Sequence, residues 1–95
     1  MSEGMQPWRT AGEEAVVDAE GMYLIPGLVD IHFHGCKGAD MCDGTKEALD
    51  VITSYEASVG VTSVCPATMT IPKDELLEVM KNAGSYEYSG GSHLV

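Results

Sequence analysis

Positive charge is scarce in this chain. Its 95 residues include 5 Lys and Arg against 15 Asp and Glu, a formal net charge of −10. Nucleic acids and anionic membranes are bound through clustered cations, and the five present are scattered: Arg9, Lys37, Lys46, Lys73 and Lys81. The composition therefore argues against nucleic acid and membrane as partners. A phosphate group on a substrate would be held weakly here, or by residues lying elsewhere.

Long apolar runs and cysteines are also few. No stretch approaches the roughly 20 consecutive apolar residues of a membrane-spanning helix. The first residues lack a basic segment followed by an apolar core, so no secretory signal is predicted. Cys36, Cys42 and Cys65 make an odd number of thiols, which favours reduced cysteines over a disulfide framework. We therefore expect a cytoplasmic protein.

The apolar patterns that are present predict alternating strands and helices. The predicted strands cover residues 15–18, 21–25, 28–33, 61–65 and 93–95. The strand over 28–33 is nearly continuous in apolar residues and is expected to be buried, as in a parallel sheet. The predicted helices cover 45–59 and a segment that begins near Pro72. Residues 1–14 and the glycine-containing segment 35–44 are predicted as loops.

Each predicted helix has an apolar face and end signals. The first face is expected to consist of Leu49, Ile52, Tyr55 and Val59. The second face is expected to consist of Leu76, Leu77, Met80 and Ala83. Either Asp43 or Thr45 could cap the first helix, and Gly60 suits its end.

The spacing of the core strands predicts the fold class. They begin about 33–36 residues apart, the length of a βαβ unit, and such units place their strands parallel. A complete eight-fold barrel takes about 250 residues. We therefore predict an α/β fold made of the first two βα units of a partial TIM (β/α)8 barrel.

The run 26–35 ends in His32 and His34, two residues apart. Side chains alternate along a strand, so both imidazoles are expected on one side, where they could bind one metal ion. Active sites of α/β barrels lie at this end of the strands, and neutral imidazole is a ligand of zinc, iron and nickel. Both histidines could instead be satisfied by backbone partners. Asp30 could orient a histidine or bond to loop amides.

Other polar side chains have a weaker claim to this site. Cys36 could ligate zinc but is expected to be a free, partly buried thiol, and Cys42 and Cys65 are expected to pack. His93 begins a strand and is therefore predicted to lie away from the metal.

Four residues near the predicted rim could contact substrate: Asp40, Asp43, Thr68 and Thr70. Helix capping by Asp43 and turn formation by the threonines are simpler interpretations.

The run 26–35, Pro-Gly-Leu-Val-Asp-Ile-His-Phe-His-Gly, resembles the first-strand signature of the amidohydrolase superfamily. More narrowly, the chain is similar to the N-acetylglucosamine-6-phosphate deacetylases. The similarity continues in register through 38–45, 55–62 and 65–70, and it covers roughly residues 20–95.

The resemblance implies a metal-dependent barrel with a small β-sandwich beside it. Residues 1–25 would be a remnant of the sandwich region, and residues 26–95 the first βα units of an incomplete barrel. His32 and His34 correspond to metal ligands, with zinc or iron as the expected divalent metal. The implied reaction is hydrolysis of the N-acetyl group of N-acetylglucosamine 6-phosphate, in a parent enzyme that is a homo-oligomer.

The family's glutamate ligand, two later histidines and catalytic aspartate would all lie beyond Val95. No catalytic residue is therefore assigned within the chain, which alone is expected to be an inactive fragment. Two alternatives remain open: another amidohydrolase, dihydroorotase- or deaminase-like, and a non-catalytic module that binds a metal or a partner.

Overall fold

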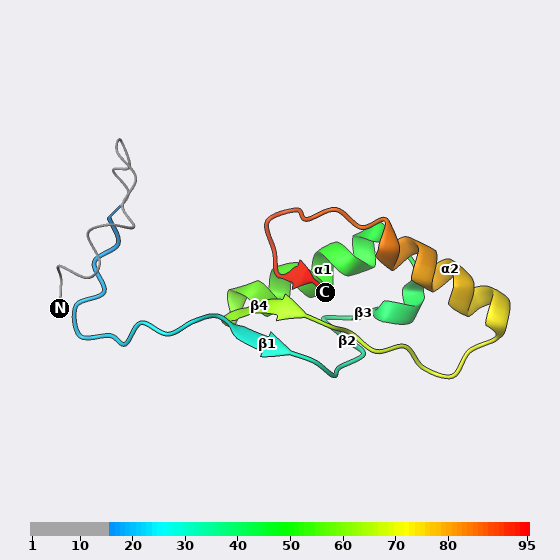
Figure 1. Cartoon of the computed structure of the whole chain (residues 1–95), viewed down its shortest axis with the longest axis horizontal. Helices are drawn as coiled ribbons and strands as arrows, with labels where there is room; N and C mark the ends of the chain where they lie inside the picture. Colours follow the sequence, from blue (N-terminus) through cyan, green and yellow to red (C-terminus); the bar gives the residue numbers. More distant parts are fainter. Residues whose placement is uncertain (1–15) are drawn as a thin grey trace.

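A parallel sheet with two helices forms the folded part of the chain, described over residues 16–95 by a computed structural model. The sheet has the order β1-β4-β5, with β1 at Leu28–Asp30, β4 at Val61–Val64 and β5 at His93–Leu94. Helix α1 (Lys46–Ser58) connects β1 to β4, and α2 (Lys73–Gly84) connects β4 to β5 (Figure 1). The predicted alternation of strands and helices is confirmed, and both strand pairs of this sheet are parallel.

The segment predicted as a loop over 35–44 contains more structure than expected. Strands β2 (Gly35–Cys36) and β3 (Ala39–Asp40) pair antiparallel, and a 3-10 turn, η2, covers Met41–Asp43. The two residues between the strands, Lys37 and Gly38, have φ angles of 53° and 79°. Positive φ at both positions is typical of the tight turn that closes a two-residue hairpin.

Helix α1 begins where its cap predicts. The Thr45 hydroxyl accepts a hydrogen bond from the Ala48 amide at 3.1 Å, so Thr45 and not Asp43 is the N-cap. At the other end, Gly60 has a φ of 96°, the left-handed conformation that suits glycine after a helix. Asp43 instead belongs to η2, where its carboxylate accepts from the Asp40 amide at 3.0 Å.

The core lies between α1, β4 and α2. Leu49, Ile52 and Val64 are fully buried, and Val79 of α2 is 3% exposed. The predicted face of α1 is correct for Leu49 and Ile52 but wrong for Tyr55 and Val59, which are exposed; Ala48, Thr53 and Glu56 are buried in their place. The buried face is shifted around the helix because α1 packs against β3 as well as against β4.

Helix α2 starts immediately after Pro72, as predicted, but its buried face is only partly the predicted one. Leu76 and Ala83 are half-buried, and Ala83 packs against the core, whereas Leu77 and Met80 are exposed. Val79, which was not predicted, is buried against Gly44 at the end of η2. The helix contacts η2, and this contact shifts the buried face from Leu77 and Met80 toward Val79.

The prediction of N-terminal strands is wrong where the structure describes them. Residues 16–27 form no strand, and their apolar side chains are exposed, Tyr23 at 96%. A strand needs a neighbouring chain for its amides and carbonyls, and this segment extends away from the sheet (Figure 1). The loop predicted over 1–14 lies outside the described residues.

Strand β1 is shorter and more exposed than predicted. It covers three residues rather than 28–33, and Leu28 and Val29 are 53% and 62% exposed. It occupies one edge of the sheet, so it pairs with β4 alone, in the register Leu28↔Val61 and Asp30↔Val64.

The parallel sheet and two helices are compatible with part of an α/β fold; the barrel, the sandwich and the domain boundary remain predictions. None of the helices in this part of the chain is long and apolar enough to span a membrane.

Candidate metal centre

The segment with the two histidines begins where β1 ends. The Asp30 carboxylate accepts a hydrogen bond from the His32 amide at 3.1 Å. An aspartate that bonds its own backbone two residues on turns the chain, so β1 stops at Asp30 and both histidines lie in the loop that follows. The expectation that they sit on the strand itself is wrong. The loop-amide role considered for Asp30 is the one observed.

The two imidazole rings nevertheless lie together. Their centroids are 5.3 Å apart and the ring planes meet at 80°, an edge-to-face arrangement. His32 is exposed to solvent, whereas His34 is half-buried. Both follow the carboxyl end of β1, the end at which the sequence predicted the site.

His34 is oriented by the backbone of the next βα unit. Its Nδ1 atom lies 3.0 Å from the carbonyl oxygen of Ala67. A carbonyl can only accept, so this contact requires the proton on Nδ1 and leaves the lone pair of a neutral ring on Nε2. A histidine held in this way through one nitrogen is prepared to ligate a metal through the other.

The loop that carries Ala67 stays paired with the histidine segment beyond the ends of the strands. The Cys65 amide donates to the Asp30 carbonyl at 2.8 Å, and the Ala67 amide donates to the Phe33 carbonyl at 2.7 Å. The main chain therefore continues the parallel pairing of β1 and β4 past the last strand residues. Sequence reasoning missed Ala67 because its contribution is a backbone carbonyl, which leaves no side-chain pattern.

The cysteines do not add to the histidine pair. All three are free, and Cys36 is half-buried on β2, as predicted. Burial raises the pKa of the Cys36 thiol and the nearby Glu56 carboxylate raises it further, against an opposing effect of Lys37. This shift favours the neutral thiol in the metal-free chain. Cys65 is exposed, so the prediction that it packs is wrong.

The remaining candidates have structural partners or lie on loops. Asp40 caps η2, its carboxylate accepting from the Cys42 amide at 2.7 Å. His93 stacks on Tyr88 with centroids 4.1 Å apart and does not form a group of metal ligands with the histidine pair. Thr68 and Thr70 lie on the loop after β4, where a substrate contact stays a prediction.

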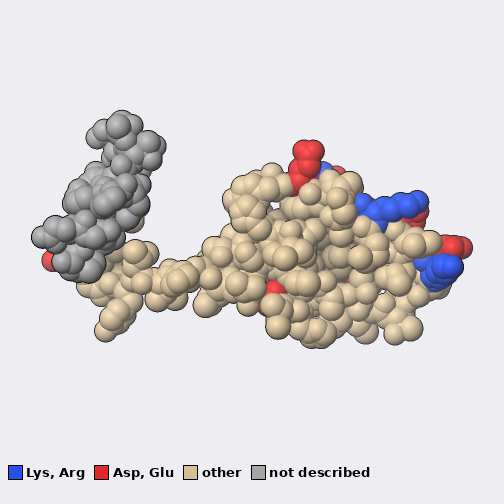
Figure 2. All heavy atoms as spheres, in the orientation of Figure 1, with Lys and Arg blue, Asp and Glu red and all other residues tan. Residues whose placement is uncertain are grey.

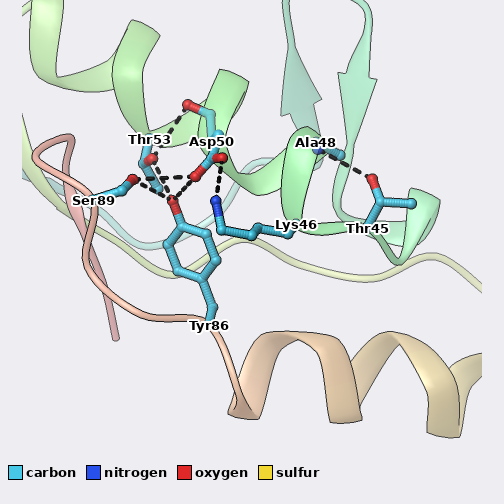
Figure 3. Close-up of polar contacts among 7 residues, drawn as sticks. All are labelled: Thr45, Lys46, Ala48, Asp50, Thr53, Tyr86 and Ser89. Carbon is cyan, nitrogen blue, oxygen red and sulfur yellow. Dashed lines mark hydrogen bonds and ion pairs between the residues drawn. The ribbon is translucent and has the colours of Figure 1, made fainter.

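A polar network joins α1 to the segment before β5 (Figure 3). The Tyr86 hydroxyl donates to Asp50 Oδ1 at 2.7 Å, and Lys46 Nζ contacts Asp50 Oδ2 at the same distance. Lys46, then Tyr86 and Ser89, hold the pKa of the Asp50 carboxyl below its usual range by hydrogen bonding. We assign this network to stability, because its side chains join α1 to the segment before β5.

The pair of histidines fits a divalent metal by its chemistry, since imidazole nitrogen is a common ligand of zinc and iron. Over residues 16–95, no three His, Cys, Asp or Glu side chains are grouped so as to hold a metal ion. The described residues thus supply the predicted pair without a grouped third ligand.

Sequence comparison identifies relatives of this chain among known enzymes. The N-acetylglucosamine-6-phosphate deacetylase of Vibrio furnissii is 33% identical over 67 residues, which are 70% of this chain and 17% of that protein. The N-acetylgalactosamine-6-phosphate deacetylase of Escherichia coli O157:H7 is 30% identical over 77 residues, 81% of this chain and 20% of that protein. The resemblance predicted from the sequence motifs is therefore confirmed.

A second kind of relative also matches. The dihydroorotase of Staphylococcus aureus strain N315 is 34% identical over 64 residues, 66% of this chain and 14% of that enzyme. The chain thus spans about a fifth or less of the length of the curated relatives that it matches. No protein-family model matches it. The relatives named as deacetylases are hydrolases of amide C–N bonds.

Proposed function

We propose that this chain contributes the first two βα units of a metal-dependent deacetylase. The reaction is hydrolysis of the N-acetyl group of N-acetylglucosamine 6-phosphate, giving glucosamine 6-phosphate and acetate. The observation that carries the proposal is the histidine pair after β1, His32 and His34, in a chain whose relatives include enzymes named for this reaction. Its partner is a small sugar phosphate, and its setting is a cytoplasmic homo-oligomer.

His32 and His34 are the residues that would hold the metal, zinc or iron. When bound, such a metal supplies Lewis-acid polarisation of an amide carbonyl. The chain's own residues position the ligands: Ala67 fixes the ring of His34, and Asp30 ends β1 so that both rings lie beyond the sheet. The general base is assigned to residues outside this chain, so the chain by itself is proposed to be inactive.

The second candidate is a dihydroorotase-like activity, favoured by the similarity to dihydroorotases. It uses the same histidine pair and differs in substrate, a cyclic rather than a linear amide. Two short sequence segments favour the deacetylase: Asp-Gly-Thr at 43–45 and Pro-Ala-Thr-Met-Thr at 66–70.

A chimera tests the proposal. The matching stretch of the Vibrio furnissii deacetylase is replaced by that of this chain, and purified protein is assayed for acetate release from N-acetylglucosamine 6-phosphate and for hydrolysis of dihydroorotate. We expect acetate release only. Turnover of dihydroorotate instead would replace the first candidate by the second, and turnover of neither by a correctly folded chimera would contradict both.

The ligand assignment has its own variant. His32→Asn with His34→Asn in the chimera is expected to lower the metal content per protomer while leaving the thermal midpoint nearly unchanged. His93→Asn is the matched control, because that ring stacks on Tyr88 and is not grouped with the pair as a metal ligand. An unchanged metal content in the double variant would remove His32 and His34 from the site.

A further inference from the structure

The short turn η2 is hydrogen-bonded both to His34 and to the loop after β4. The Met41 amide donates to the carbonyl of His34 at 2.8 Å. The next residue, Cys42, accepts a hydrogen bond at its Sγ atom from the Met69 amide, at 3.2 Å. Met69 lies two residues beyond Ala67, on the same loop. One turn therefore holds the main chain of His34 and, through a thiol, the loop whose carbonyl binds the His34 ring.

We propose that Cys42 is a positioning residue for His34. Its sulfur anchors the loop after β4 so that the Ala67 carbonyl keeps His34 in the Nδ1–H tautomer, with Nε2 available to a divalent metal. The metal-binding consequence rests on the proposed function; the tautomer itself does not.

Hydrogen bonding decides the tautomer of a neutral histidine. The proton stays on the nitrogen that has an acceptor. When the acceptor moves away, the Nδ1–H and Nε2–H tautomers are both populated. The loop from Cys65 to Ile71 contains no strand or helix, so its position beyond Ala67 depends on local contacts. Main-chain bonds fix the loop as far as the Ala67 amide. The contact between Cys42 and Met69 restrains it on the far side of the Ala67 carbonyl.

The other two cysteines lack this placement. Cys36 lies on β2 and Cys65 is exposed, and neither thiol makes a hydrogen bond in the part of the chain that the structure describes. Replacing Cys42 should also spare its own backbone, because the Cys42 amide bonds to Asp40 whatever the side chain is. Cys42→Ala therefore removes one acceptor, and Cys42→Ser restores an acceptor at nearly the same place.

The test is long-range ¹H–¹⁵N NMR of the imidazole nitrogens in the 95-residue chain, without metal, at about pH 8, where an ordinary histidine is neutral. We expect His34 as the Nδ1–H tautomer in the wild type and in Cys65→Ala. Cys42→Ala should give a mixture of tautomers, and Cys42→Ser should restore the wild-type pattern. The Nε2–H form in the wild type, or an unchanged pattern in Cys42→Ala, overturns the inference.

A second measurement uses the wild type alone, so it tests the proposal even if Cys42→Ala does not fold. In the wild type, the Met69 amide should exchange with solvent more slowly than the amides of exposed loop residues. Fast exchange at Met69 removes the anchoring contact and with it the proposal.

Zinc titration followed on the same signals extends the test. We expect about tenfold weaker binding to His34 in Cys42→Ala, the size of effect that partners of ligands produce. Equal zinc affinity in both proteins overturns the metal-binding part. A Cys42-dependent tautomer in a chain whose chimera does not release acetate would uphold the positioning role and reject the deacetylase, so the two failures are distinguishable.

Discussion

Among single residues, Asn82 of α2 carries a local cost. Its Nδ2 atom is buried and has no hydrogen-bond partner within residues 16–95. A buried donor without an acceptor destabilises a fold, and alanine is a better helix former than asparagine. We expect Asn82→Ala to raise the free energy of unfolding by about 0.5–1 kcal/mol, measured by urea denaturation. A loss of stability would show that the amide has an acceptor in solution.

Asp50 gives a prediction on pH at the same scale. Its carboxyl pKa is lowered in the folded chain, first by the hydrogen bond to Lys46 and then by Tyr86. Ionised Asp50 therefore stabilises the fold at neutral pH, and this contribution is lost as the pH falls through the lowered pKa. At pH 7 the thermal midpoint of Asp50→Asn should lie below that of the wild type. This difference should shrink as the pH falls below about 4.

The control for this pH dependence is Glu78→Gln. Glu78 forms an ion pair with Lys81 on α2, and both of these side chains are about three-quarters exposed to solvent. An exposed pair of this kind contributes little to stability, so its removal should leave the thermal midpoint nearly unchanged across the same pH range. A pH-independent difference between wild type and Asp50→Asn would contradict the role of the ionised carboxylate.

At the scale of elements, β5 depends on a close approach to α1. A Cβ added at Gly91 would lie 2.7 Å from the backbone of Thr53, and the Ser92 amide bonds to the Thr53 carbonyl at 2.9 Å. Gly91→Ala should therefore displace β5 from the sheet and lower the free energy of unfolding by about 1–3 kcal/mol. Gly84→Ala, at the end of α2, has no atom within 4 Å of the added Cβ and should be neutral or stabilising. Chemical denaturation of both variants compares them, and equal effects would contradict the contact.

The same scale shows which features a sequence can predict. Thr45 and Gly60 mark the ends of α1, and Pro72 marks the start of α2, because caps and prolines act within a few residues. Burial depends on neighbours that are distant in sequence, so the apolar pattern places Tyr55 on the wrong side of α1. The histidine pair is found from its spacing, whereas the hydrogen bond from His34 to Ala67 joins residues 33 positions apart and needs the fold.

For the whole molecule, exposed apolar surface and net charge have opposite effects on self-association. Large apolar side chains are exposed along one continuous stretch, residues 22–31, which includes the edge strand β1. The face drawn in Figure 2 shows few charged atoms over β1, and its Lys residues lie toward the end that holds α2. Surfaces of this kind promote association, and a net charge of −10 opposes it.

Salt should therefore drive self-association of this chain. Raising NaCl from about 0.02 M to about 0.5 M shortens the Debye length to a few ångströms and screens the repulsion between copies, while the attraction of apolar surface persists. We expect the weight-average mass in sedimentation equilibrium to rise with salt. Val29→Thr with Ile31→Thr keeps charge and β-branching but removes apolar surface, so its mass should rise less; Val51→Thr, exposed on α1, is the matched control. A mass that falls with salt would mean that ion pairs, rather than this apolar stretch, hold the copies together.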